Sequence, residues 1–290
     1  MKVSVIVPTM ATQQRAPLLK RAIESIRHSS KFPIRIIVVV NGKRYDSETC
    51  EWLKAQPDIH FEYLETASAP KSVLRGRELV TSEFFSTLDD DDEYLEGATD
   101  KRIQLMELDP AFDLVVSNGY RNVGGIDRLL YTNLAEVTAN SLRSLMDFNW
   151  LSSCNALYRT ASVELAYFTD SHAYAEWTWL AYRLAKDRKN VGTLNRPTFR
   201  INDTADSLSK SESYDNSYLP LFERMLDGGP PANIARLIRR KMAAQWHAES
   251  NAALTKGNRM RALKCHWQSL LEVGGLQYLS YSRKFFLPNR

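Results

Sequence analysis

Short, uniformly apolar segments alternate with segments of helical periodicity over the first ninety residues. Residues 3–7 form a β-branched run that ends at Pro8, and residues 34–40 form a second apolar run that ends at Asn41. Pro17 opens a segment with one apolar stripe, and proline is well tolerated in the first turn of a helix. The pattern predicts strands at 3–7, 34–40, 61–64 and 84–88, and helices from Pro17, after Asp46 and at 71–80.

Strands that are apolar on both faces and separated by helices indicate a parallel sheet that helices cover on both sides. The predicted fold class is therefore α/β, with a mostly parallel, Rossmann-like sheet. In such sheets ligands bind beyond the carboxyl ends of the strands. Three polar segments follow strands in this way: Pro8-Thr9, Asn41-Gly42 and Asp89–Asp92. We expect a single ligand to reach all three.

The rest of the chain predicts a helix at 103–108, strands at 114–117 and 152–158, a hairpin tip at 122–127, a helix at 174–185 and extended structure at 191–201. From Tyr218 onward the pattern is helical. The Gly228–Pro231 interruption is the expected boundary between a catalytic unit and a basic helical appendage. We divide the chain into residues 1–100, 101–215 and 216–290.

Charge adds to this picture because it is unevenly distributed. The 290 residues hold 38 Lys and Arg against 34 Asp and Glu, a net charge of +4. Residues 221–290 hold 12 basic and 4 acidic residues, a balance of +8, so residues 1–220 carry −4. The basic tail is a candidate for contact with an anionic surface such as a membrane leaflet or an anionic glycan, for packing on the catalytic unit, or for contact with a second subunit in a homo-oligomer. The alternative is a solvated helical face.

Cysteine usage and the N-terminus bear on localisation. Cys50, Cys154 and Cys265 are widely spaced, which favours reduced thiols and a cytoplasmic setting over a disulfide framework. The first apolar run is cut by Pro8 and is too short for a signal sequence. No segment approaches the ~18 uninterrupted apolar residues of a membrane-spanning helix. We expect a soluble, cytoplasmic protein, with the inner face of the membrane as its candidate peripheral site.

The acidic segment Asp89–Asp92 carries the main chemical signal. Four adjacent carboxylates repel one another, and a divalent cation removes that repulsion. Mg²⁺ or Mn²⁺ takes one or two carboxylates together with phosphate oxygens and water. An Asp-x-Asp segment at a strand end therefore suits a metal bridged to a diphosphate leaving group. The alternative is an acidic turn in which Asp92 caps the following helix.

Three segments in this order, VSVIVPT, IIVVVNG and SEFFSTLDDDDEYLEG, resemble the successive fingerprints of the family 2, GT-A-type glycosyltransferases. The resemblance is clear over residues 1–100 and looser up to residue 210. It implies a nucleotide-sugar-binding half at 1–100 and an acceptor-binding half at 101–215. It also implies metal-dependent, inverting transfer of a sugar from a nucleotide-diphosphate donor, by default a UDP-sugar. The implied acceptor is a glycan or a lipid-linked molecule in surface polysaccharide assembly.

By that resemblance, Asp91 binds the metal with Asp89 as its partner, and Asp90 lies near the ribose hydroxyls. Members often carry a metal-ligating His in the segment where this chain has Asn202. Asn202 is therefore the third candidate ligand, although an amide oxygen binds a divalent cation more weakly than an imidazole does.

The resemblance also implies a set of donor-binding residues. Pro8 and Thr9 end the first strand, and Thr9 faces the nucleobase together with Asn41, where members often carry Asp. Basic residues that precede the fourth strand are candidates for contact with the base or the pyrophosphate, the alternative being a solvated helix face. They are Lys71, Arg75 and Arg77.

Inverting transfer needs a carboxylate that takes the proton of the acceptor hydroxyl. The segment 175–184, AEWTWLAYRL, resembles the start of a family helix in which a second acid follows the first. Glu176 fits the role of base, and its aromatic neighbours raise its pKa by desolvation and offer a stacking face. Trp177 replaces the second acid, so Asp170 is the alternative base. A third reading, in which Glu176 only caps the helix, stays open.

Other functions compete with this one. They would leave no role for Asn155, in a small-residue segment that resembles the border of the family's acceptor pocket, or for Trp177, which are the candidate acceptor contacts. A sugar nucleotidyltransferase or a Rossmann dehydrogenase needs a glycine-rich loop after the first strand, and MATQQRAP contains no glycine. A catalytically lapsed nucleotide-sugar-binding protein stays open because the second acid and the His are replaced. The acidic cleft argues against a nucleic-acid partner.

Overall fold

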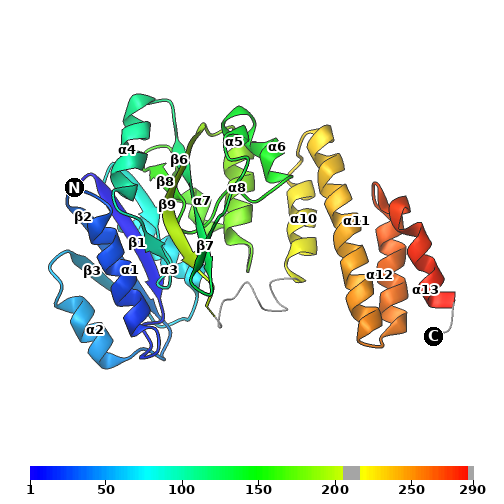
Figure 1. Cartoon of the computed structure of the whole chain (residues 1–290), viewed down its shortest axis with the longest axis horizontal. Helices are drawn as coiled ribbons and strands as arrows, with labels where there is room; N and C mark the ends of the chain where they lie inside the picture. The colour runs from blue at the N-terminus through cyan, green and yellow to red at the C-terminus, as the bar shows by residue number, and fades with distance from the viewer. Residues whose placement is uncertain (205–215, 287–290) are drawn as a thin grey trace. The chain divides into compact units, whose positions relative to one another are not determined.

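The structure, a computed structural model, describes residues 1–204 and 216–286. The chain splits into two compact units, Met1–Ser207 and Leu208–Arg290 (Figure 1). The expected boundary at Gly228–Pro231 is wrong, because this segment joins two helices of the second unit that pack on each other. Glycine and proline here break a helix and do not separate domains. The predicted boundary between residues 215 and 216 adjoins a segment outside the described ranges and stays a prediction.

One sheet runs through the first unit in the order β3-β2-β1-β4-β8-β6-β9-β5, and β7 pairs with β6. Strands β1 to β4 are parallel to one another where they pair, which confirms the α/β class and the mostly parallel sheet. The strands are β1 (Val3–Thr9), β2 (Ile34–Asn41), β3 (Ile59–Leu64), β4 (Phe84–Thr87), β5 (Glu93–Tyr94), β6 (Leu114–Val123), β7 (Ile126–Leu129), β8 (Ala156–Arg159) and β9 (Val191–Asn202).

Helices connect and cover these strands, and local sequence sets where they begin. Proline lies in the first turns of α1 and α3, and the Asp46 side chain accepts a hydrogen bond from the Thr49 N–H to cap α2. The helices of the first unit are α1 (Ala16–His28), α2 (Ser47–Lys54), α3 (Ala69–Glu78), α4 (Ala98–Leu108), α5 (Glu136–Ala139), α6 (Ser141–Leu145), α7 (Ala166–Thr169) and α8 (Glu176–Lys186).

Strand directions determine which loops meet at one edge of the sheet. Strand β8 runs antiparallel to both β4 and β6, so β6 and its parallel neighbour β9 run in the same direction as β4. The carboxyl ends of β1, β2, β4, β6 and β9 therefore lie at one edge, which we name the carboxyl edge (Figure 1). The apolar residues of β1 and β2 are buried on both faces, as the sequence pattern predicts.

Two local expectations need correction. The predicted strand at 152–158 is shorter, because residues 152–155 form a loop before β8. Asp92 does not cap a helix: β5 follows it, and α4 begins only at Ala98 after Gly97, which adopts a left-handed backbone conformation. The acidic segment is therefore free of the structural role that competed with ligand binding.

The second unit is a set of packed helices. Its elements are α10 (Tyr218–Asp227), α11 (Ala232–Thr255), α12 (Arg259–Leu271), the 3₁₀ helix η2 (Gly275–Ser282) and α13 (Arg283–Phe286). Helix α12 packs on α11 and on η2. In the part of the chain that the structure describes, no helix is long and apolar enough to cross a membrane.

Candidate functional site

The acidic segment lies at the carboxyl edge, directly after β4, and its second carboxylate is locked in place. Asp90 is 4% exposed. It accepts hydrogen bonds from the Thr9 hydroxyl at the end of β1 and from the Arg15 guanidinium, whose Nε lies 2.9 and 3.0 Å from the two carboxylate oxygens. Arg15 also lies 3.1 Å from a carboxylate oxygen of Asp91. Sequence reasoning missed Arg15, the main cation at this site.

Residues at and just after the end of β9, together with Arg21 of α1, form hydrogen bonds to Asp91 and Asp92. The Asn202 side-chain amide donates to the Asp91 carbonyl at 2.8 Å, and its backbone N–H donates to the Asp92 carboxylate at 3.0 Å. The Thr204 hydroxyl donates to the Asp91 carboxylate at 3.2 Å, and the Arg21 guanidinium donates to the Asp91 carbonyl at 2.8 Å. The structure thus places Asn202 beside the acidic segment, where its side-chain amide nitrogen is used to donate to the Asp91 carbonyl.

Asp89 and Asp92 are crowded by the neighbouring carboxylates of the acidic segment. The Asp89 carboxylate accepts a hydrogen bond from the Ser153 hydroxyl at 2.6 Å. Within residues 1–204 and 216–286, no Lys, Arg or His lies within ion-pair distance of either carboxylate. Burial, and then repulsion from Asp91 and Asp90, raise the pKa of Asp89 to about 7. Burial and the neighbouring carboxylates also hold the pKa of Asp92 well above its usual range.

The crowded carboxylates of the acidic segment fit a divalent cation. Asp89 and Asp91 present two hard carboxylate ligands two residues apart, which suits Mg²⁺ or Mn²⁺ when a diphosphate and water complete the shell. Among the described residues, no group of three or more His, Cys, Asp or Glu side chains could hold a metal by itself. The residues therefore fit a cation that arrives with an anionic ligand better than a metal held by protein alone.

The loop after β1 and the end of β2 form the adjoining part of the site. Pro8 and Thr9 are buried, and the Thr9 hydroxyl accepts from the Ala11 N–H at 2.9 Å. Ala11 is fully buried with φ +47°, a conformation that a non-glycine residue adopts only under constraint. Asn41 bridges two segments, donating to the Thr9 carbonyl at 2.9 Å and accepting from the Ser68 N–H at 3.0 Å.

A buried arginine supports the loop that carries Ser153. Arg102 is 1% exposed and donates to the Cys154 carbonyl and to the Thr198 hydroxyl, both at 2.8 Å. Its guanidinium also lies over the Tyr94 ring, 4.7 Å from the centroid. Helix α4 is thereby tied to β9 and to the loop before β8, so the position of Ser153 depends on Arg102.

Asn155 is fully buried, and its amide is used inside the same loop. It donates to the Trp150 carbonyl at 2.8 Å and accepts from the Ser152 N–H at 2.9 Å. The expectation that Asn155 contacts the acceptor therefore needs correction: its side chain shapes the loop and has no surface to offer a ligand. Trp177, the other expected acceptor contact, is partly exposed on α8.

The three basic residues of α3 differ in their surroundings. Arg75 pairs with Glu62 at 3.3 Å and with Glu78 at 2.9 Å, so its charge is engaged by other carboxylates than those of the acidic segment. Arg77 is buried, donates to the Thr160 and Val163 carbonyls and lies over the Phe85 ring. Lys71 is exposed in the first turn of α3. Arg77 is thus structural, and neither a solvated side chain nor a donor contact.

Glu176 begins α8 and is held by backbone donors. Its carboxylate accepts from the Tyr174 N–H at 3.0 Å, and burial raises its pKa. Tyr174 has φ +65°, a strained conformation of a kind that concentrates at functional sites. Asp170 is about half exposed; the Trp179 indole donates to its carboxylate at 3.3 Å, and the Arg183 guanidinium lies 3.9 Å away. Its carboxylate is therefore engaged by two side chains of α8.

Topology places Glu176 at the carboxyl edge. Helix α8 leads into β9, and β9 begins at the edge opposite to the acidic segment, next to the start of β6. The helix therefore runs against β9, with its last residues near the start of that strand. Its first residue, Glu176, lies at the end that approaches the carboxyl edge.

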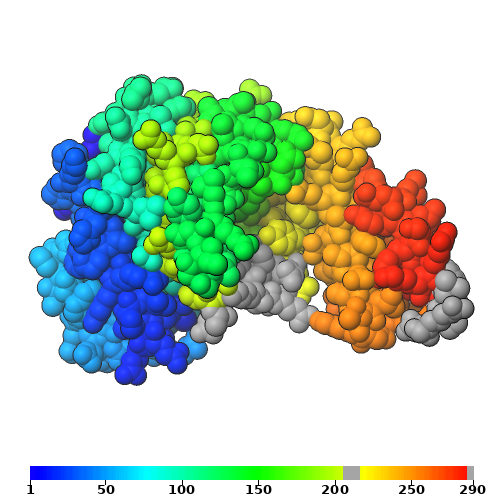
Figure 2. Space-filling view, in the orientation of Figure 1, coloured from blue at the N-terminus to red at the C-terminus, as the bar shows by residue number. Residues whose placement is uncertain are grey.

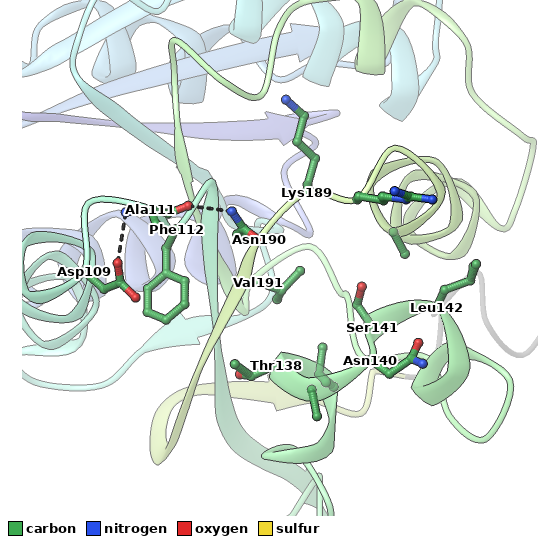
Figure 3. A pocket seen from close by; sticks show the side chains of 14 residues that line it. Asp109, Ala111, Phe112, Thr138, Asn140, Ser141, Leu142, Lys189, Asn190 and Val191 are labelled. Atoms are coloured by element: carbon green, nitrogen blue, oxygen red, sulfur yellow. Dashed lines mark hydrogen bonds between the residues drawn. The ribbon is translucent and has the colours of Figure 1, made fainter.

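A cavity of about 370 Å³ lies elsewhere (Figure 3). It is lined by residues at the end of α4, in α5 and α6, and at the starts of β6 and β9, at the edge opposite to the acidic segment. Close to it, the Asn190 amide donates to the Ala111 carbonyl at 3.1 Å. Neither the acidic segment nor Glu176 lines this cavity. The candidate site is therefore the carboxyl edge.

Comparison with solved structures defines the class of this fold. S. aureus TarS residues 1–349 in complex with UDP-GlcNAc matches with a TM-score of 0.68 and 14% identity, over 94% of this chain and 82% of that chain. The same protein in complex with UDP matches with a TM-score of 0.57 and 12% identity, over 100% and 93%. At these identities the likeness is one of fold, and it confirms the expected GT-A fold.

The family follows from the sequence itself. The pattern of "Glycosyl transferase family 2" matches residues 4–165, more than half of the chain. The protein belongs to this family and is a nucleotide-sugar glycosyltransferase, which sets aside the nucleotidyltransferase and dehydrogenase alternatives. No curated protein matches the chain in a sequence search.

Proposed function

We propose that the protein transfers a sugar from a nucleoside-diphosphate donor to an acceptor hydroxyl, with inversion, in the assembly of a glycan. The observation that carries this proposal is the acidic segment at the carboxyl edge, where Asp89 and Asp92 have no ion-pair partner among the described residues and neighbouring carboxylates help to raise the pKa of both. A divalent cation that arrives with the diphosphate would supply the positive charge that balances these carboxylates. A UDP-sugar is the default donor, supported by the bound UDP-GlcNAc and UDP of the TarS structures.

We assign the metal to Asp89 and Asp91. Bound there, Mn²⁺ or Mg²⁺ supplies charge stabilisation to the diphosphate as it leaves. Asn202 positions Asp91 through its amide donor to the Asp91 carbonyl. Arg15 lies between Asp90 and Asp91 and holds the two carboxylates in a fixed geometry, because a guanidinium can donate to both at once.

Donor recognition falls to the ends of β1 and β2. The Asn41 amide donates to the Thr9 carbonyl, and the Thr9 hydroxyl donates to the Asp90 carboxylate. A nucleoside bound to Thr9 and Asn41 would therefore lie next to Asp90. Lys71 at the start of α3 is the basic residue that remains as a candidate donor contact, because Arg75 is engaged by Glu62 and Glu78.

Glu176 is the proposed base, in preference to Asp170. Burial raises the pKa of Glu176, which suits a group that accepts a proton, and the backbone N–H of Tyr174 fixes its orientation. In this role it accepts the proton of the acceptor hydroxyl as the hydroxyl oxygen bonds to the anomeric carbon. The partly exposed Trp177 beside it offers a face on which an acceptor sugar can stack.

The test is transfer or hydrolysis of UDP-sugars in the presence of Mn²⁺. Asp91→Ala is expected to lower turnover at least about a hundredfold, and Glu176→Gln to lower kcat about a hundredfold or more with little change in donor KM. Asp147→Ala is the matched control, since Asp147 forms an exposed ion pair with Arg143. Full turnover by Asp91→Ala would refute the metal assignment. Donor binding without any turnover by the wild type would show a lapsed enzyme.

A further inference from the structure

Helix α12 in the second unit exposes a row of large apolar side chains. Met260, Leu263, Trp267 and Leu271 are 80%, 44%, 61% and 66% exposed. At about 100° per residue these positions fall on one narrow face of the helix. We name this row the α12 stripe. Helix α12 and the segments after it form part of the surface seen in Figure 2, in orange to red.

The α12 stripe lies opposite the face by which the helix is packed. Ala262, Cys265, His266 and Ser269 are buried and lie about 180° around the helix from the stripe at this helical spacing. The helix therefore already has its apolar partner on one side. A helix that is apolar on two opposite faces is normally covered on both, and contiguous exposed apolar surface marks an interaction site.

The charged residues of α12 itself are all basic. Helix α12 contains no Asp or Glu, and its Arg259, Arg261 and Lys264 are all exposed. Arg261 is paired with Glu249 at 3.0 Å, whereas Lys264 follows the stripe along the same face. A ligand of this face must therefore combine an apolar region, which the stripe can enter, with negative charge near the basic residues.

We propose that the α12 stripe docks on an anionic lipid bilayer. Leucine, methionine and tryptophan side chains with lysine and arginine at their flanks are the composition of an interfacial helix, in which the apolar row enters the headgroup region and the cations meet anionic lipid. A second copy of the chain is a poorer occupant, because a two-fold axis through the stripe brings the same cations of both copies together without an acidic partner on α12.

The test is flotation of the full chain with vesicles at low ionic strength. The wild type is expected to bind vesicles that contain phosphatidylglycerol, to bind phosphatidylcholine vesicles weakly, and to be released by salt. Trp267→Ser with Leu271→Ser is expected to weaken binding at least about a hundredfold, since burial of each side chain contributes about tenfold or more. Leu108→Ser, at a 75% exposed position in the first unit, is the matched control.

Two further variants separate charge from apolar contact and locate the inserted residue. Lys264→Glu is expected to weaken binding about 30-fold, whereas Lys31→Glu, at an exposed position of the first unit, leaves it unchanged. Brominated lipid is expected to quench the fluorescence of the wild type, and Trp267→Phe removes most of that quenching while it keeps the binding.

Three results would overturn the proposal: no binding of the wild type to anionic vesicles, equal binding by the stripe variant, or quenching that survives in Trp267→Phe. If the wild type does not bind vesicles but forms a dimer, and Trp267→Ser with Leu271→Ser dissociates that dimer, the α12 stripe would instead contact a second copy of the chain. Because these readouts need no sugar transfer, they stand or fall separately from the proposed activity.

Discussion

Asp89→Asn is expected to stabilise the metal-free protein while it abolishes transfer. The Asp89 carboxylate is buried beside Asp91 and Asp90, which raises its pKa from 3.8 to about 7. The folded state therefore binds more protons than the unfolded state between these values, and the free energy of unfolding falls as pH rises through that window. At pH 8 the full difference corresponds to roughly 4 kcal/mol, an upper bound for a carboxylate that keeps some exposure.

Asparagine removes this charge but can still accept the hydrogen bond from the Ser153 hydroxyl. In urea unfolding with a chelator present, we expect Asp89→Asn to be about 1–3 kcal/mol more stable than wild type at pH 8. The gap should close below about pH 3, where the wild-type carboxylate is protonated in both states. A variant that is less stable at pH 8, or a gap of the same size at both pH values, would refute the charge argument.

Three further changes test the supports of the site. Gly76→Ala places a Cβ 2.3 Å from Ile6 Cγ2, and we expect a loss of about 2 kcal/mol in urea unfolding; an unchanged midpoint would contradict the tight contact of α3 with β1. Arg102→Met removes the buried donors to the Cys154 carbonyl and the Thr198 hydroxyl, at a cost of about 3 kcal/mol, measured as a lower unfolding midpoint. Burial holds the pKa of the Cys154 thiol well above its usual range, so mass spectrometry after iodoacetamide treatment at neutral pH should find it alkylated only in denaturant.

The parallel half of the sheet was predictable because its signals are local. The apolar runs that form β1 and β2 are buried on both faces, so each reads as a strand without knowledge of its neighbours. The cap of α2 by Asp46 and the proline that opens α1 are likewise contained in a few residues. These elements place the acidic segment at the carboxyl edge, which is why the position of the candidate site could be inferred.

The remaining parts of the site depend on contacts between distant segments. Arg15 and Asp90 are 75 residues apart, and nothing around Arg15 in the sequence indicates that it pairs with the carboxylates of the acidic segment. Ser153 reaches Asp89 only because β8 inserts antiparallel between β4 and β6. Asn155 was misread for the same reason: a polar residue in a small-residue segment gives no indication that its amide is used inside the loop.

Diffraction from crystals soaked with Mn²⁺ and UDP tests the central claim most directly. The anomalous signal of manganese locates the ion independently of the protein coordinates. We expect one peak at coordinating distance from the carboxylates of Asp89 and Asp91, with the diphosphate on its other side and the uracil near Thr9 and Asn41. Manganese and diphosphate bound in the cavity beside Asn190 and Ala111, with the acidic segment unoccupied, would contradict the account.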